Sequence, residues 1–199
     1  MRRSIVLAAI LAGTLTGGGV VPAEEGKGVY GGVSWGRTDA RDGCEQFSRS
    51  FPTLACDESS SGWRVFLGYR FASFLGVFGE YTGFGEIDAV ADTSGGAVAV
   101  SADGGGYGLG LEVRVPVLER FEAFATAGMF RWEVEASSSG GYRAEEDDSE
   151  PMFGLGGRFA VSPRFWIGAE WKRYQDVGDR ATTGQDDLDF VSVTFELRQ

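Results

Sequence analysis

The sequence of 199 residues contains no histidine. Histidine is the commonest general base near neutral pH. Its absence excludes a Ser–His–Asp triad and every other catalytic arrangement that depends on an imidazole. Carboxylate-only and Ser–Lys chemistry stay open on this ground alone. We predict that the protein is not an enzyme and that it binds no cofactor.

Long apolar segments are also missing. After residue 23, no stretch of the chain approaches the roughly 18 consecutive apolar residues that mark a membrane-spanning helix. Positive charge is scarce as well, since the formal net charge is −11. A chain this acidic is a poor partner for the phosphate backbone of nucleic acids, so we exclude nucleic acid as a ligand.

Residues 1–23 have the layout of a secretory signal peptide. Arginines at positions 2 and 3 precede an apolar segment, Ile5–Leu15, that is too short to span a bilayer. The small residues of Val21-Pro22-Ala23 predict cleavage after Ala23, which leaves residues 24–199 as the mature domain. The alternative is an N-terminal anchor helix, which three glycines at 17–19 and a proline at 22 interrupt.

Cysteine is limited to Cys44 and Cys56. An exported chain meets an oxidising compartment, where an even pair at short spacing usually closes. We therefore predict a disulfide between Cys44 and Cys56. Two free thiols are the alternative. A metal site at these cysteines is less favoured than either, because two thiolates are too few ligands and the chain has no histidine.

What the chain does contain is a repeated pattern of alternating side chains, clearest in residues 62–71. The odd positions are bulky and apolar: Trp63, Val65, Leu67, Tyr69 and Phe71. The even positions include Arg64, Gly68 and Arg70. Because successive side chains of a strand point to opposite faces, one face of this strand is apolar and the other carries charge.

The same pattern recurs along the mature chain. It predicts strands at residues 28–37, 62–71, 74–84, about 102–117, 121–134, 152–161, 165–174 and 188–198. Long polar loops at 38–61, 85–101, 135–150 and 175–187 alternate with very short turns. This asymmetry and these strand lengths are typical of outer-membrane barrels. The predicted fold is all-β, an eight-stranded antiparallel up-and-down transmembrane β-barrel. A soluble sandwich with its apolar face inward is the alternative.

In a barrel of this kind the charged positions face the lumen. Ten of them form the predicted interior charge network: Arg64, Arg70, Glu80, Glu112, Arg114, Arg158, Glu170, Lys172, Glu196 and Arg198. Eight strands leave an interior that side chains can fill, so these charges must pair or meet trapped water. A rigid salt-bridge core is the first interpretation. The second is a small gated channel in which Glu80 or Glu170 exchanges arginine partners.

Aromatic residues gather at the predicted strand ends. Trp35, Trp63 and Trp132 lie toward the long loops, and Phe71, Phe74, Phe121 and Phe165 lie toward the short turns. Two such belts are expected at the two membrane interfaces. The acidic segments Glu145–Asp148 and Asp186-Asp187 have two interpretations, divalent-cation binding at the lipopolysaccharide surface or simple solvation, and solvation is the simpler one.

Several of these segments together resemble the OmpA-like transmembrane barrel family. The similarity rests on Gly62–Phe71, followed by Gly79–Gly85, then Phe130-Arg131-Trp132, Ala169–Tyr174 and Val191-Ser192-Val193. It covers residues 28–198. The family's C-terminal aromatic residue, which the insertion machinery recognises, is replaced by Gln199, and a peptidoglycan-binding domain is not expected.

The resemblance implies a location in the cell outer membrane of a Gram-negative bacterium. The implied partners are outer-membrane lipid and lipopolysaccharide, with the barrel-assembly machinery and periplasmic chaperones during biogenesis. We predict a structural, envelope-integrity role with four extracellular loops. An adhesin or host-interaction protein that binds an unknown ligand through the loops is the alternative, and a narrow gated pore is the second alternative.

Overall fold

The structure is a computed structural model that describes residues 27–41, 53–56, 59–93, 96–138, 143–178 and 185–199. The predicted signal peptide and Cys44 lie outside the described residues. Cys56 lies in a described strand, but its side chain is not described. The cleavage after Ala23 and the disulfide therefore stay predictions.

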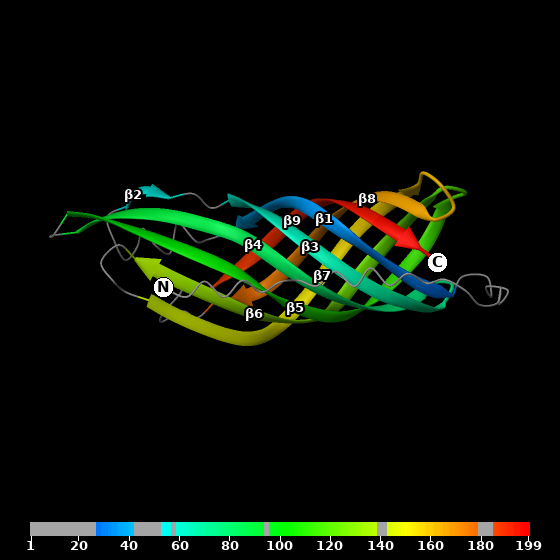
Figure 1. Ribbon diagram of the computed structural model, residues 1–199, viewed down its shortest axis with the longest axis horizontal. Coiled ribbons are helices and arrows are strands. Elements are labelled where there is room, and N and C mark those ends of the chain that lie inside the picture. Colours follow the sequence, from blue (N-terminus) through cyan, green and yellow to red (C-terminus); the bar gives the residue numbers. More distant parts are fainter. Residues whose placement is uncertain (1–26, 42–52, 57–58, 94–95, 139–142, 179–184) are drawn as a thin grey trace, which may run out of the picture.

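The described chain folds into nine antiparallel strands. They are β1 (Gly28–Ala40), β2 (Thr53–Cys56), β3 (Ser59–Ala72), β4 (Leu75–Thr93), β5 (Gly96–Leu118), β6 (Phe121–Ser138), β7 (Arg143–Ala160), β8 (Phe165–Val177) and β9 (Asp186–Arg198). Each long strand pairs with the next, and β1 pairs with β9, so that the ring closes (Figure 1). The short β2 adds to β4 outside this ring. The predicted eight-stranded up-and-down barrel is confirmed.

None of the described residues forms a helix of the length and hydropathy that a membrane crossing requires.

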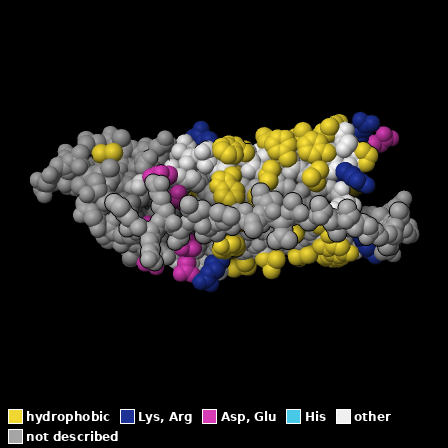
Figure 2. All heavy atoms as spheres, in the orientation of Figure 1, with side chains coloured by type: hydrophobic (Ala, Val, Ile, Leu, Met, Phe, Trp, Pro, Cys, Tyr) yellow, Lys and Arg dark blue, Asp and Glu magenta, His cyan; other side chains and the backbone are white. Residues whose placement is uncertain are grey.

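The strands alternate as the sequence indicates. On β3 the side chain of Leu67 is 65% exposed on the outer surface, whereas Arg64 is 4% exposed inside. Figure 2 shows the hydrophobic side chains gathered on the outer surface of the barrel. This is the reverse of a soluble sandwich, because the apolar face is outside and the charged face is buried.

The two ends of the barrel differ. At one, which we call the turn end, β1 begins, β9 ends, and short turns join β3 to β4, β5 to β6 and β7 to β8. It lies on the right in Figure 1. At the opposite end, which we call the loop end, the β4–β5 and β6–β7 hairpins extend well beyond the rest of the wall.

These extensions correct the predicted loop boundaries. Residues 85–101, predicted as a loop, belong largely to the β4–β5 hairpin, which stays paired as far as Thr93 and Gly96. Residues 135–150, also predicted as a loop, belong largely to β6 and β7, paired as far as Ser137 and Arg143. The alternation of apolar residues marks only the part of a strand that faces an apolar phase. The backbone hydrogen bonds of the ladder do not depend on this alternation and continue past it.

The other two predicted loops are also shorter than expected. β1 continues to Ala40 and β3 starts at Ser59, with β2 between them. In the neighbouring connection, β8 continues to Val177 and β9 starts at Asp186. The same physical reason applies, since polar residues can extend an antiparallel ladder wherever both strands continue side by side.

Aromatic side chains pack inside the barrel toward the loop end. Tyr174 contacts the rings of Phe130 and Phe84, with centroid distances of 4.4 and 4.9 Å. Trp132 is part of this cluster and is only 3% exposed, so its predicted place in the outer aromatic belt is wrong. It shares the inner face of β6 with Phe130, two residues earlier. The strand period therefore fixes its direction more strongly than its residue type does.

The membrane placement of the outer wall can be tested with an arginine substitution at two different depths in the bilayer. Leu109, in the middle of β5, and Leu118, at the end of that strand, are both exposed, by 66% and 70%. We expect Leu109→Arg to lower the free energy of unfolding in lipid vesicles by about 2–4 kcal/mol, because an arginine at the bilayer midplane loses its hydration. Leu118→Arg should cost about 0–1 kcal/mol. Urea titration of both variants measures this, and equal losses would contradict the membrane placement.

Candidate functional site

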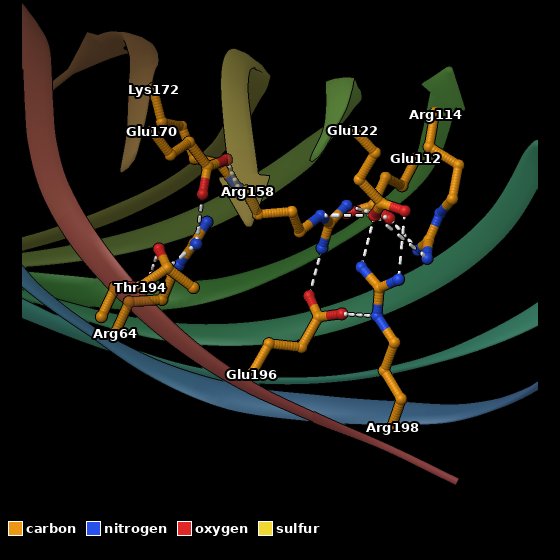
Figure 3. A network of polar contacts seen from close by, with 11 residues as sticks. Arg64, Glu112, Arg114, Glu122, Arg158, Glu170, Lys172, Thr194, Glu196 and Arg198 are labelled. Atoms are coloured by element: carbon orange, nitrogen blue, oxygen red, sulfur yellow. Dashed lines mark hydrogen bonds and ion pairs between the residues drawn. The ribbon is translucent and has the colours of Figure 1, made fainter. Parts of the chain in front are cut away.

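The interior charges form two clusters along the barrel axis. The loop-side cluster consists of Arg64, Glu80, Glu170 and Lys172, and the turn-side cluster consists of Glu112, Arg114, Glu122, Arg158, Glu196 and Arg198. They come from β3, β4, β5, β6, β7, β8 and β9, so the contacts cross the lumen rather than follow one strand. Figure 3 shows the side chains pointing toward one another across the barrel.

Arg64 and Lys172 hold the loop-side cluster together. The Arg64 guanidinium contacts Glu80 at 3.2 Å through Nη1 and pairs with Glu170 through Nη2. Lys172 Nζ lies 2.5 Å from Glu80 Oε2 and 3.6 Å from Glu170 Oε1. The hydroxyl of Tyr174 donates a hydrogen bond to Glu80 at 3.0 Å. Two acids and two bases thus neutralise one another in a buried site.

Hydroxyl groups complete this cluster. Arg64 donates to Ser34 Oγ at 3.0 Å, and Ser34 and Thr194 share a hydrogen bond of 2.9 Å. Thr82 and Tyr174 share another of 2.9 Å. Buried polar groups of this kind are stabilising only when they have partners. The predicted charge network named only charged residues, and these hydroxyl groups join it because their even positions put them on the same inner face.

Arg158 occupies the centre of the turn-side cluster. Its guanidinium lies 2.7 Å from Glu112 and 2.8 Å from Glu122, and it also pairs with Glu196. Arg198 pairs with Glu122 and approaches Glu196 at 2.5 Å. Arg114 pairs with Glu112 and lies 3.7 Å from Glu122. Three carboxylates and three guanidinium groups therefore form one continuous network.

Glu122 is a central member that the sequence analysis missed. It contacts Arg114, Arg158 and Arg198 from the start of β6. The signal was present, because Phe121 was predicted to lie in the outer belt and the next residue must then face inward. Glu122 was missed because a residue so close to a turn in the sequence suggests exposure to solvent.

Arg70 is the one predicted interior charge that differs. It is half-buried, and it forms no ion pair with a described residue. Its Nε atom is buried without a hydrogen-bond partner, a state that it shares with the Nε atoms of Arg64, Arg114 and Arg158. The strand neighbours of Arg70 are Gly28 and Gly76, which bring no side chain to it. Arg70 therefore stands at the turn end of the network rather than inside it.

Aromatic rings fill the lumen between the charges. Arg158 lies over Phe124 at 4.0 Å from the ring centroid, Arg198 over Trp166 at 3.7 Å, and Lys172 over Phe78 at 4.7 Å. The face of an aromatic ring attracts a cation, most strongly when both are desolvated. The Tyr30 ring fills the space over Gly68, where even a Cβ atom would overlap it. A cavity of about 20 Å³ remains between the clusters, which holds about one or two water molecules.

The remaining belt residues lie on the outer surface. Trp35 and Trp63 are exposed toward the loop end, and Phe71 and Phe74 are exposed at the turn end. Phe121 and Phe165, also at the turn end, are half-exposed. Three aromatic rings form a row that starts at Trp63. The centroid distance from Trp63 to Tyr81 is 5.4 Å, and that from Tyr81 to Tyr107 is 5.0 Å.

The outer surface of the loop end carries a second set of ion pairs. Four arginines there have an aspartate partner: Arg37 with Asp39, Arg41 and Arg173 with Asp189, and Arg131 with Asp147. Within the described ranges, no group of three or more acidic or cysteine side chains is arranged to hold a metal ion. The alternative of cation binding at Asp186-Asp187 thus gains no support from the described geometry.

The described chain is thus a closed antiparallel barrel with a paired charge network inside. A protein-family model described as the outer membrane protein beta-barrel domain matches residues 5–198. This chain belongs to the outer-membrane β-barrel family. The family membership agrees with the sequence resemblance and places the chain in the outer membrane of a Gram-negative bacterium.

Solved structures agree with this fold. Ail, the attachment invasion locus protein of Yersinia pestis, has a TM-score of 0.52 at 16% identity, over 87% of this chain and 99% of that chain. Neisserial surface protein A has a TM-score of 0.59 at 13% identity, over 86% and 97%. The N-terminal barrel of Pseudomonas aeruginosa OprF has a TM-score of 0.52 at 11% identity, over 86% and 99%.

No curated protein matches the sequence significantly. The structural similarities lie at identities of 16% or less, so they establish the architecture and carry no particular activity.

The contribution of Glu122 to stability can be tested by substitution. Glu122→Ala leaves Arg114, Arg158 and Arg198 with two buried carboxylates instead of three, so uncompensated positive charge remains in the lumen. Removal of one partner from a buried pair costs about 3–5 kcal/mol. We expect a loss of that order in urea titrations of the folded barrel. Glu119→Ala, at an exposed turn position three residues away, is the matched control and should change stability by less than about 0.5 kcal/mol.

Proposed function

We propose that this protein is a structural outer-membrane barrel that supports the envelope and presents four loops outside the cell. The observation that carries the proposal is the buried network, in which five carboxylates pair with five cations across the lumen. Such a core ties seven strands to one another. A barrel stiffened in this way acts as an anchor, and the proposed role involves no catalysis.

The filled lumen is the main argument against a pore. Both charge clusters and the aromatic rings between them occupy the axis, and the cavity of about 20 Å³ has room for about one or two water molecules. Conduction requires a continuous aqueous path, which barrels of roughly 16–18 strands leave open, whereas eight strands leave an interior about wide enough for side chains to fill. Opening this barrel would require several buried ion pairs to break together.

The proposed orientation follows from the connections. Short turns face the periplasm in barrels of this type, and long hairpins face outward. The proposed contacts are therefore lipopolysaccharide at the loop end and phospholipid at the turn end. The barrel-assembly machinery and periplasmic chaperones are proposed partners during biogenesis.

Adhesion is the second candidate, favoured by the β4–β5 and β6–β7 hairpins that extend beyond the barrel. Ail is named as an attachment protein, and one of its structures holds the heparin analogue sucrose octasulfate. The hairpins of this chain carry exposed acidic residues such as Glu133, Asp147 and Asp148. Because like charges repel, a ligand for these hairpins would be basic rather than a sulfated saccharide.

Planar-bilayer recordings separate the structural role from the pore. We expect the folded protein to give flat current traces over long recordings, because the lumen is filled by paired side chains. Glu80→Ala, which removes the carboxylate shared by Arg64 and Lys172, should also leave the traces flat. Discrete current steps in the parent protein that change amplitude in Glu80→Ala would replace the structural proposal by the pore.

Complementation separates the structural role from adhesion. We expect cells that lack the protein to become more sensitive to detergent. A variant in which a two-residue turn replaces residues 87–102 keeps the barrel but loses the tip of the β4–β5 hairpin. It should restore detergent resistance to the level of the parent protein. If it restores nothing although the folded barrel is present in the outer membrane, the function resides in the hairpins instead.

A further inference from the structure

Exposed arginines at the two ends of the barrel differ in their partners. At the loop end, the exposed Arg37, Arg41 and Arg131 and the partly buried Arg173 each have an aspartate of the same chain within 4 Å. At the turn end, Arg120 and Arg164 are exposed, and neither forms an ion pair with a described residue. The turn end therefore offers two guanidinium groups whose charge the described protein leaves uncompensated.

Both arginines occupy the same structural position. Arg120 and Arg164 are the last residues before β6 and β8, and each is followed by a belt phenylalanine, Phe121 or Phe165. Their backbones are fixed to the neighbouring strands. The amide of Ala160 donates to the Arg120 carbonyl at 2.8 Å, and the amide of Arg198 donates to the Arg164 carbonyl at 2.9 Å. Each side chain thus extends from a rigid point on the rim.

Acidic residues are scarce at this end, although the chain has a net charge of −11. In the three short turns, which the structure describes completely, Glu119 is the only acid. Arg70 adds a half-buried cation at the mouth of the lumen. The basic side chains of this end lie at the right of Figure 2. Glu24 and Glu25, which precede β1 in the chain, lie outside the described residues. The exposed arginines of the described rim at the turn end are Arg120 and Arg164.

We propose that the turn end binds the phosphate groups of anionic phospholipids through Arg120 and Arg164, with one headgroup at each arginine. The site itself rests on the membrane placement of the family. The assignment of these lipids to the periplasmic leaflet rests on the proposed orientation. Guanidinium groups bind phosphate oxygens through paired, charge-assisted hydrogen bonds.

The surroundings favour a lipid over a soluble acidic partner. Strongly exposed apolar side chains flank both arginines: Leu118 precedes Arg120 by two residues, and Val161 precedes Arg164 by three. With the belt phenylalanines, they place each guanidinium at the border of the apolar band. Lipid phosphates lie at that depth, where long cationic side chains reach them from the protein wall. Only strand β7 lies between β6 and β8, which Arg120 and Arg164 precede, so the two arginines lie on the same stretch of the rim.

Lipid selectivity around the reconstituted protein tests the proposal. The folded protein is placed in phosphatidylcholine vesicles, and spin-labelled phosphatidylglycerol is compared with spin-labelled phosphatidylcholine for association with the protein. We expect phosphatidylglycerol to be enriched at low salt, by up to about fivefold per arginine site. The enrichment should fall as salt is added, because exposed charges are screened.

The variants use matched arginines. Arg120→Gln and Arg164→Gln should each remove part of the enrichment, and the double variant should abolish it. Arg131→Gln, an exposed loop-end arginine paired with Asp147, is the control and should keep the enrichment of the parent protein. Because Arg120 and Arg164 are exposed turn residues, these variants should fold. A difference in gel migration between heated and unheated samples checks this.

Two outcomes overturn the proposal. One is equal association of both lipids with the parent protein, and the other is full enrichment in the double variant. A soluble acidic partner is then the remaining use of these arginines. The result is independent of the proposed envelope role, because selectivity in symmetric vesicles concerns the rim alone. Failure in the complementation experiment would leave lipid selectivity intact, and the reverse also holds.

Discussion

Every strand of this protein depends on the closure of the hydrogen-bonded ring. Lipid offers no partner to a backbone amide or carbonyl, so an open sheet edge within the membrane would leave a row of unpaired groups. The pairing of β1 with β9 and of β4 with β5 removes both edges. Closure also fixes which face is inside. With only eight strands, the inside is narrow, and each inward side chain must fit against those of the opposite wall.

The narrow interior explains why the charges come in balanced clusters. An unpaired charge in such a lumen would lose its hydration with no compensation. In the loop-side cluster Glu80 and Glu170 balance Arg64 and Lys172, and the turn-side cluster contains equal numbers of glutamates and arginines. The one exception, Arg70, stands at the turn end, where it remains half-exposed. Position along the axis thus decides whether a charge needs an internal partner.

Strand alternation predicted the ring, the outer face of β3 and the inward direction of the ten charges, because a period of two is fixed by backbone geometry. It did not predict how far β4 and β5 extend, because residues 85–101 are rich in glycine, alanine and aspartate rather than in the bulky apolar residues that mark the barrel wall. Trp132 was misplaced because its residue type suggested an interface, whereas its parity on β6 turns it inward. Which carboxylate pairs with which cation depends on distances across the lumen, and Arg158 contacts acids of three other strands that no spacing in the sequence connects.

The balance of charge inside has a consequence for the outside. Because the buried clusters are neutral, nearly all of the net charge of −11 belongs to groups outside them. The outer charges are therefore not required for the stability of the core, and each end can be charged to suit its surroundings. At the loop end, arginines are paired with aspartates and further acids project from the hairpins. At the turn end, Arg120 and Arg164 are left without such partners. An acidic chain with unpaired cations on one rim is the arrangement expected when that rim meets phosphate groups.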